Sequence, residues 1–266
     1  MRRFLLLLSL LLVAGVARAQ HSLSVTGPSG AQSFTAAELS ASPQVTDVTI
    51  THDPVFNRAM NYRAVPTAML LQKAGIGPDG YVQARAVDDF SVAIPARVLL
   101  SPAAFLAVED PAKPWPKLSK GGRREGIGPF YLVYRDGQRP SSEYWVYRLA
   151  ALKLTDSPIK RWPQLAVAAD LATDAPARRG LERFVEVCFA CHRFRGAGEG
   201  TQGPDLGTPM NPVAYFQPAA LKKLLRDPES VRSWPERKMP AFTPEMLSDS
   251  DIDAIIAWLT YKEGTR

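Results

Sequence analysis

The sequence Cys188-Phe189-Ala190-Cys191-His192 decides the fold of the C-terminal third of the chain. Two cysteines three positions apart lie near one face of a helix end, within reach of the two vinyl groups of one porphyrin. The adjacent histidine can place an imidazole nitrogen on the iron. The motif therefore predicts one covalently attached haem c, held by Cys188, Cys191 and His192.

Three alternatives to haem attachment fit this cysteine pair less well. A disulfide across two residues closes a very small loop and stabilises little. A redox-active Cys-x-x-Cys pair normally precedes a helix in a βαβ setting, and no such pattern surrounds Cys188. A zinc site needs further ligands, for which the chain offers only His21 and His52. Haem attachment also accounts for the residues that flank the motif.

The sequence around the motif predicts two helices, one ending at the motif and one at the C-terminus, with a long loop between them. Gly180, Phe184 and Cys188 recur at intervals of four along one helical face. The last helix opens with a capping box formed by Ser248 and Asp251. Apolar residues then follow at helical spacing: Ile252, Ile255, Ile256 and Leu259.

With these features, residues 177–262 resemble class I c-type cytochromes. In that family the first and last helices cross closely, and a glycine makes room for an aromatic residue of the partner helix. Gly180, Phe184, Ile255 and Trp258 match those positions. The resemblance implies an all-α fold around the haem. Because this region carries all of these motifs, we expect a chain that starts near Asp174 to fold and bind haem by itself.

The resemblance also implies a second axial ligand and a partner for the histidine. The family places a methionine, typically followed by proline, in the loop before the last helix, which favours Met239 in Lys238-Met239-Pro240. Met210 and Met246 are the other methionines after His192. In Gly203-Pro204-Asp205, Pro204 matches the residue whose carbonyl accepts the second N–H of the histidine, although this tripeptide is also common in ordinary turns.

The N-terminus has the pattern of a secretory signal. Arg2 and Arg3 precede an apolar run from Phe4 to Val13, and Ala17-Arg18-Ala19 supplies small residues for cleavage. We expect a signal peptide over residues 1–19 and a periplasmic mature protein. The apolar run is short for an uncleaved membrane anchor, and no later segment is apolar enough to span a membrane.

The charge of the chain gives no reason to expect nucleic-acid binding. Removal of the signal peptide lowers the formal net charge from +6 to +3, since the segment carries three arginines and no acid. No clustered basic helix with interleaved aromatic residues is present in the sequence.

The region from residue 20 to 156 is typical of an α+β domain with a mainly antiparallel sheet. Thr35 and Glu38 form a capping box, and Pro66 and Gly75 bracket a second short helix. We expect residues 113–129 to form a surface loop. β-branched and aromatic residues predict strands at Val45–Ile50, Tyr81–Val87, Phe130–Tyr134 and Tyr144–Leu154.

The order of these elements resembles a shortened molybdopterin-binding domain of the sulfite oxidase family, over residues 22–154. Catalytic members hold molybdenum through a cysteine, and this region contains none. The strand that would end near that ligand runs instead into Thr51-His52-Asp53-Pro54. We therefore expect no molybdenum cofactor, and a domain that docks or binds a partner.

Two features of this domain allow both a structural and a functional interpretation. His52 and Asp53 are either structural turn residues or part of a binding site. The basic stretch is either a solvated face or a patch that steers an acidic redox partner; its residues are Lys113, Lys117, Lys120, Arg123 and Arg124.

The sequence thus predicts a signal peptide (1–19), an α+β domain (20–156), a linker (157–176) and a cytochrome c domain (177–266). The favoured function is single-electron transfer between redox partner proteins, without catalysis. One alternative is an oxidoreductase, or a subunit of one, that oxidises a small molecule at the first domain. The second is a ligand-binding or sensory module.

Overall fold

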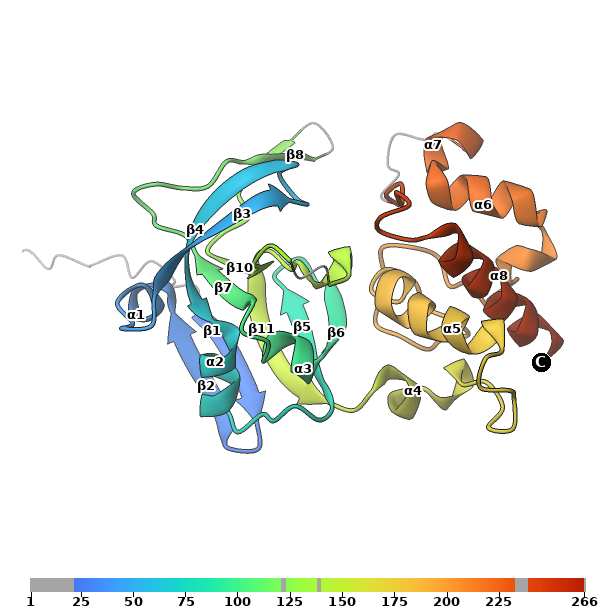
Figure 1. Ribbon diagram of the computed structural model, residues 1–266, viewed down its shortest axis with the longest axis horizontal. Coiled ribbons are helices and arrows are strands. Elements are labelled where there is room, and N and C mark those ends of the chain that lie inside the picture. The colour runs from blue at the N-terminus through green and yellow to red at the C-terminus, as the bar shows by residue number, and fades with distance from the viewer. Residues whose placement is uncertain (1–21, 121–122, 138–139, 233–238, 266) are drawn as a thin grey trace, which may run out of the picture.

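The computed structural model describes residues 22–120, 123–137, 140–232 and 239–265. A β-sheet domain with short helices is followed by a helical region (Figure 1). This confirms the predicted fold class. The expected signal peptide, residues 1–19, lies outside the described residues. Within the described part of the chain, no helix is long and apolar enough to cross a membrane.

Two sheets form the N-terminal domain. The first has the strand order β2-β1-β11-β5-β6, and the second has the order β10-β7-β4-β3. β1 pairs with β11 in parallel and every other pairing between these strands is antiparallel, as predicted. The strands are β1 (Ser22–Gly27), β2 (Gly30–Thr35), β3 (Thr46–Asp53), β4 (Arg58–Pro66), β5 (Tyr81–Ala86), β6 (Ser91–Pro95), β7 (Ala104–Val108), β10 (Phe130–Tyr134) and β11 (Leu149–Thr155).

The core of this domain lies on both faces of the second sheet. All five residues of β10 are buried, and successive side chains point to opposite faces of a strand. Phe130 and Leu132 pack into the cluster shared with the first sheet, whereas Tyr131 and Val133 pack into a second cluster on the opposite face. Burial on both faces explains the continuous apolar sequence of this strand.

The short helices follow the local signals in the sequence. Helix α1 (Ala36–Ser40) begins at the predicted capping box of Thr35 and Glu38. Helix α2 (Thr67–Lys73) follows Pro66, and Gly75 after it has a positive φ, a conformation that favours glycine. A third short helix, α3 (Ala96–Leu99), was not predicted.

Two local predictions were wrong. The expected loop over residues 113–129 contains a hairpin of β8 (Leu118–Lys120) and β9 (Arg123–Glu125). The expected strand Tyr144–Leu154 begins only at Leu149, because the preceding residues form the 3₁₀ helix η1 (Ser142–Tyr144), which Ser141 caps through the backbone N–H of Glu143.

The helical region is built around the crossing of its first and last helices. A Cβ at position 180 would overlap the carbonyl group of Ala254, so only glycine permits this approach. Phe184 stacks on Trp258 with ring centroids 4.3 Å apart. The predicted close crossing is confirmed. The elements from the connecting segment onward are α4 (Pro158–Arg161), η2 (Pro163–Leu165), α5 (Pro176–Arg183), the π-helical turn η3 (Phe184–Cys188), η4 (Pro212–Ala214), α6 (Pro218–Arg226), α7 (Pro228–Val231) and α8 (Asp249–Gly264).

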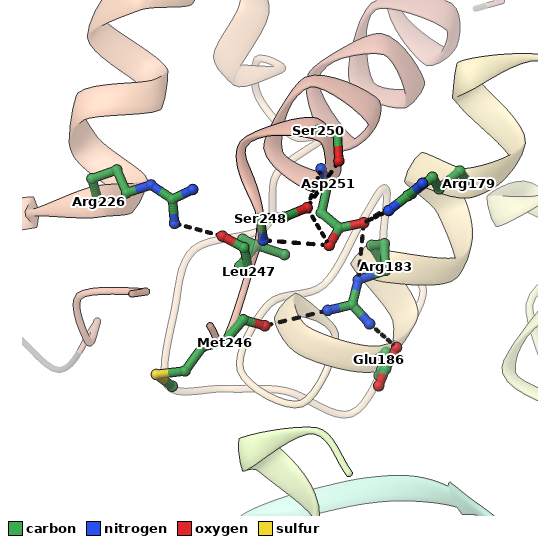
Figure 2. A network of polar contacts seen from close by, with 9 residues as sticks. All are labelled: Arg179, Arg183, Glu186, Arg226, Met246, Leu247, Ser248, Ser250 and Asp251. Carbon is green, nitrogen blue, oxygen red and sulfur yellow. Dashed lines mark hydrogen bonds and ion pairs between the residues drawn. The ribbon is translucent and has the colours of Figure 1, made fainter. Parts of the chain in front are cut away.

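A polar network ties α5 to the start of α8 (Figure 2). Ser248 and Asp251 form the predicted capping box. The carboxylate of Asp251 also accepts a hydrogen bond from Arg179 Nε at 2.9 Å, and Arg183 Nε lies 3.5 Å from it. Arg183 pairs in addition with Glu186 in the π-helical turn η3. The helix crossing is therefore held by charge as well as by packing.

The segment expected to be a linker packs on the helical region. Leu165 is fully buried in the helical core, and its carbonyl accepts a hydrogen bond from Trp258 Nε1 at 3.2 Å. Two further hydrogen bonds attach the segment to α8, from Lys262 Nζ to the Ala166 carbonyl and from Ala168 N to Tyr261 Oη. The segment therefore contributes to the packing of the helical region, while folding of a chain that starts near Asp174 stays a prediction.

The two domains meet at two places. Arg161 in α4 pairs with Glu199 and hydrogen-bonds Gln83 of β5, while Ser91 of β6 donates to Glu199 at 3.0 Å. At the second place Ser141 Oγ donates to the carbonyl of Glu186 at 3.1 Å, which joins the residue before η1 to η3. The helical region is thus docked on one edge of the sheet domain (Figure 1).

Candidate haem site

A π-helical turn presents the Cys-x-x-Cys-His motif. Helix α5 continues into η3, where Phe189 N donates to the carbonyl of Phe184, five residues earlier. π-turns inside α-helices widen the helix locally and are frequent at functional sites. Cys188 ends this turn, and His192 N closes the next one on the Cys188 carbonyl at 2.9 Å.

The motif forms one wall of a cavity of about 370 Å³, within the range of small-molecule and cofactor sites. Cys188, Cys191 and His192 all line it. The rest of the lining is mostly apolar. Most of it comes from residues between Gln202 and Phe242 and from the last helix, α8. Prominent apolar members are Phe184, Leu206, Leu221, Leu225, Phe242 and Ile255.

His192 is oriented by the carbonyl of Pro204. Its Nδ1 lies 2.8 Å from that oxygen. Because a carbonyl only accepts, Nδ1 carries the hydrogen, and Nε2 of the neutral ring keeps the lone pair that a metal requires. Burial lowers the pKa of His192, which favours this neutral form, although the Pro204 contact acts in the opposite direction.

The loop after the motif is held close to His192 by backbone contacts. A Cβ at position 203 would overlap the imidazole ring, so Gly203 lets the chain pass over the histidine. Asp205 accepts hydrogen bonds from the backbone N–H groups of Arg195, Gly196 and Gly207. Burial alone would raise the pKa of Asp205, but these three donors outweigh it and lower the pKa below the ordinary value.

Cys188 differs from the reactive cysteine of a redox-active pair. Burial raises the pKa of the Cys188 thiol to about 12, and the nearby charge of Glu143 acts in the same direction. Reactive Cys-x-x-Cys pairs have a lowered pKa, since the thiolate is the nucleophile. The structure therefore gives no support to thiol–disulfide chemistry at Cys188. For the zinc alternative, the described residues contain no group of three His, Cys, Asp or Glu side chains placed to hold a metal ion.

Met239 lies on the same cavity as His192. It is half-buried and packs against the core of the helical region. Neither of the other two methionines after His192 is among the described residues that line the cavity: Met210 is 53% exposed and Met246 is 36% exposed. The Met246 side chain points away from the Asp251 network (Figure 2). Lys238, which precedes Met239, lies outside the described residues.

Comparison with protein families gives one match. Residues 175–259 match the family described as cytochrome C oxidase, cbb3-type, subunit III. The C-terminal region is a cytochrome c domain. The match covers about a third of the chain and leaves the family of the N-terminal domain unidentified. A comparison with curated proteins gives no match.

The residues of the cytochrome domain fit a haem. The cavity is apolar, as a porphyrin face requires, and both cysteines of the Cys-x-x-Cys-His motif face it together with the oriented histidine. A cytochrome c domain with this motif implies haem-based electron transfer. Sequence reasoning identified the motif because its residues are adjacent in the chain.

Among the lining residues that the sequence did not indicate, one comes from the other domain. Glu143 of η1 lines the cavity of the cytochrome domain although it belongs to the sheet domain. Its only sequence context is a polar stretch, Ser141-Ser142-Glu143, before an aromatic run. No local pattern links this stretch to a motif 45 residues later, so sequence reasoning had no signal by which to find it.

His52 and Asp53 do not form a joint site. His52 is exposed, whereas Asp53 is buried. The Asp53 carboxylate accepts hydrogen bonds from Tyr62 Oη at 2.7 Å and from the backbone N–H groups of Val55 and Phe56. Asp53 therefore stabilises the turn between β3 and β4, which is the structural alternative.

Proposed function

We propose that the protein is a periplasmic mono-haem c-type cytochrome that passes single electrons between redox partner proteins. The observation that carries this proposal is the convergence of Cys188, Cys191, His192 and Met239 on one apolar cavity within a cytochrome c domain. Its location outside the cytoplasm rests on the signal sequence at residues 1–19.

Each residue has a distinct role in this proposal. Cys188 and Cys191 would attach the haem through thioether bonds, and His192 and Met239 would be the axial ligands. Pro204 would fix the histidine tautomer and increase its basicity. The bound haem supplies a one-electron iron couple. With both axial positions taken by side chains there is no open position for a substrate, which favours an electron carrier over a catalyst.

The sheet domain is proposed as a docking or binding module. The order of motifs in its sequence resembles that of the molybdopterin-binding domain of the sulfite oxidase family. It contains no cysteine to ligate molybdenum. The buried carboxylate of Asp53 is engaged by its own turn, and the domain contacts the cytochrome domain on both sides of the motif, through Glu186 and Glu199.

Covalent attachment is the direct test of the haem. The purified full-length protein should keep its haem through acid–acetone extraction, because thioether bonds survive it. Cys188→Ala and Cys191→Ala should each weaken this retention, and His192→Ala should abolish the low-spin spectrum. Complete extraction of haem from the wild-type protein would refute the proposal.

The second axial ligand is tested by paired methionine variants. Met239→Ala should remove the weak near-infrared band of sulfur–iron coordination and lower the reduction potential, since a thioether opposite histidine raises it. Met210→Ala is the matched control, because Met210 is exposed and is not among the lining residues. Loss of the band in Met210→Ala and its survival in Met239→Ala would reverse the assignment.

A further inference from the structure

The wall of the haem cavity includes one carboxyl group from the other domain. Glu143 lies in η1, between β10 and β11 of the sheet domain, and lines the cavity together with Val187 and Cys188. Cys188 interacts electrostatically with Glu143, which places the carboxyl group close to a proposed attachment site. An acidic side chain is unusual in a mostly apolar lining, and its position needs a physical reason.

The position of Glu143 is fixed by contacts across the domain interface. Ser141 Oγ donates to the carbonyl of Glu186 at 3.1 Å, which ties the start of η1 to the π-turn before Cys188. Tyr144 is buried, and Tyr134 Oη of β10 donates to its carbonyl at 3.3 Å. The backbone on either side of Glu143 is therefore held in place, by the cytochrome domain at Ser141 and by the sheet at Tyr144.

Within the part of the chain that the structure describes, Glu143 has no compensating cation. Among the described residues no lysine, arginine or histidine lies within ion-pair distance of it, and its side-chain partner is Ser142 Oγ at 3.3 Å. Burial raises the pKa of Glu143 to about 7, against the effect of the Ser142 hydrogen bond. The protonated and ionised forms are then both accessible near neutral pH.

Other titratable and charged groups surround this carboxyl group. Arg183 of α5 interacts electrostatically with the Cys188 thiol and with Tyr144. Tyr144 also interacts with Glu186 of η3, Tyr81 of β5 and Arg97 of α3. Arg232, beyond α7, lines the same cavity, as do Cys191 and His192. Within this group Glu143 is the acidic residue that lines the cavity itself.

We infer that Glu143 couples electron uptake at the haem to proton uptake, so that the sheet domain sets the reduction potential of the cytochrome domain. This inference rests on the proposed function. In the coupled step a one-electron donor protein passes one electron to the iron, and the Glu143 carboxylate takes one proton from solvent. The carboxylic acid releases that proton when the electron leaves, so charge and protons balance over the cycle.

Electrostatics gives the direction of the coupling. Reduction removes one positive charge from the iron centre and thereby weakens the attraction that stabilises a nearby carboxylate. The apolar cavity screens this interaction less than water does. Glu143 therefore binds its proton more tightly in the reduced protein, and by linkage a protonated Glu143 favours reduction.

The test is the midpoint potential of the full-length, haem-loaded protein, measured spectroelectrochemically between pH 5 and pH 9. The potential should fall as pH rises through neutrality. The redox equilibrium constant should change by up to tenfold per pH unit, which is about 59 mV for a one-electron couple. Glu143→Gln should abolish this dependence and hold the potential near the acidic limit of the wild type, because glutamine is neutral like the protonated acid.

Three further measurements show whether the pH dependence comes from the Glu143 carboxyl group. Glu143→Asp restores a carboxyl group and should restore a pH dependence. Glu182→Gln removes an equal charge from the exposed face of α5 and should leave the wild-type curve unchanged. The reduced-minus-oxidised infrared spectrum should contain a protonated carboxyl band in the wild type that Glu143→Gln lacks.

Two outcomes would overturn the inference: a wild-type potential that does not vary with pH, or a Glu143→Gln variant that keeps the wild-type dependence. Both require a haem-loaded protein. A chain that attaches no haem would contradict the proposed function instead, so the two failures are distinguishable.

Discussion

The two domains use their buried polar groups in different ways. In the sheet domain two of these groups satisfy the domain's own backbone: Asp53 holds a turn, and Thr67 Oγ1 donates to the carbonyl of Ala104 at the start of β7. In the cytochrome domain one polar contact instead orients a proposed haem ligand, because the carbonyl of Pro204 accepts from Nδ1 of His192. The residues proposed to bind the haem therefore lie in the cytochrome domain, and the sheet domain contacts that domain at the interface.

The boundary between the domains is less sharp than the sequence suggests. Ala190, inside the Cys-x-x-Cys-His motif, packs into the core of the sheet domain. In the other direction, Trp162 and Leu165 of the connecting segment pack into the core of the cytochrome domain. Trp162 also contacts the ring of Phe189, with centroids 5.2 Å apart. Each hydrophobic core therefore includes residues from outside the domain boundaries that the sequence predicts.

The largest effect is expected from removing the connecting segment. A haem-loaded fragment that starts at Asp174 should be less stable than one that starts at Ser157 by about 3 kcal/mol or more. It loses the burial of Leu165, worth about 2 kcal/mol, and leaves Trp258 Nε1 without its acceptor, which costs about 1 kcal/mol or more. Denaturant titration of both fragments measures the difference. Equal midpoints would show that the segment is a true linker.

The helix crossing gives the next largest effect. Gly180→Ala places a methyl group against the backbone of Ala254, which cannot move without separating α5 from α8, so we expect a loss of about 1–3 kcal/mol. Gly264→Ala is the matched control in α8, since its added Cβ would meet open space among the described residues. Thermal unfolding of the haem-loaded proteins compares them. Equal stability of the two variants would contradict the close crossing.

Local sequence signals predicted the cytochrome domain well. The capping box of Ser248 and Asp251 spans four residues, and Gly180 and Trp258 belong to helices with clear periodicity. Helix α6 was missed, because its residues lie in what the sequence presents as one long loop. In the sheet domain, β10 was predicted from its apolar run. The equally apolar β7 was missed, as was β1, in which Leu23 and Val25 alternate with polar residues.

No pattern in the sequence indicated the contacts between the two domains. Glu143 and Leu165 reach the cytochrome domain through the tertiary fold, and neither stands at a recognisable spacing from Cys188. The π-turn at Phe184–Cys188 was also unforeseen, because a change from i+4 to i+5 hydrogen bonding leaves the residue pattern of a helix almost unaltered. Patterns of neighbouring residues therefore identify the haem-attachment motif, but they do not identify the tertiary contacts around it.

A smaller effect is expected at the charged network of the helix crossing. Burial alone would raise the pKa of Asp251, but its contacts with Ser248, Arg179 and Arg183 outweigh it and lower the pKa below the ordinary value. A lowered folded-state pKa contributes stability above the unfolded-state pKa and loses it as pH falls through the folded-state value. Asp251→Asn should thus cost about 1–2 kcal/mol at pH 7 and little in acid.

The matched control for Asp251 lies on the same helix. Asp253 is exposed and pairs with Lys222. Because exposed ion pairs contribute little to the free energy of unfolding, Asp253→Asn should leave stability nearly unchanged at every pH. Melting temperatures from pH 3 to pH 8 test both variants. A pH-independent loss in Asp251→Asn would show that its effect is steric.

The smallest expected effect concerns the basic patch of the sheet domain, defined by Lys113, Lys117, Arg123 and Arg124. All four are exposed; Lys120 belongs to the same stretch, but its side chain lies outside the described part of the structure. If the patch steers an acidic partner, the rate at which a small acidic iron–sulfur protein reduces the haem should fall as salt is raised, since screening shortens the range of attraction.

Charge removal within this patch makes the steering measurable. Replacing Arg123 and Arg124 with glutamine should lower the low-salt rate on the order of twofold to fivefold and flatten the salt dependence. Arg58→Gln, an exposed charge at the start of β4, is the control and should keep the wild-type slope. Identical salt dependence in the double variant and the wild type would leave the hairpin as a solvated face, and would restrict the influence of the sheet domain on electron transfer to its contact with the haem cavity.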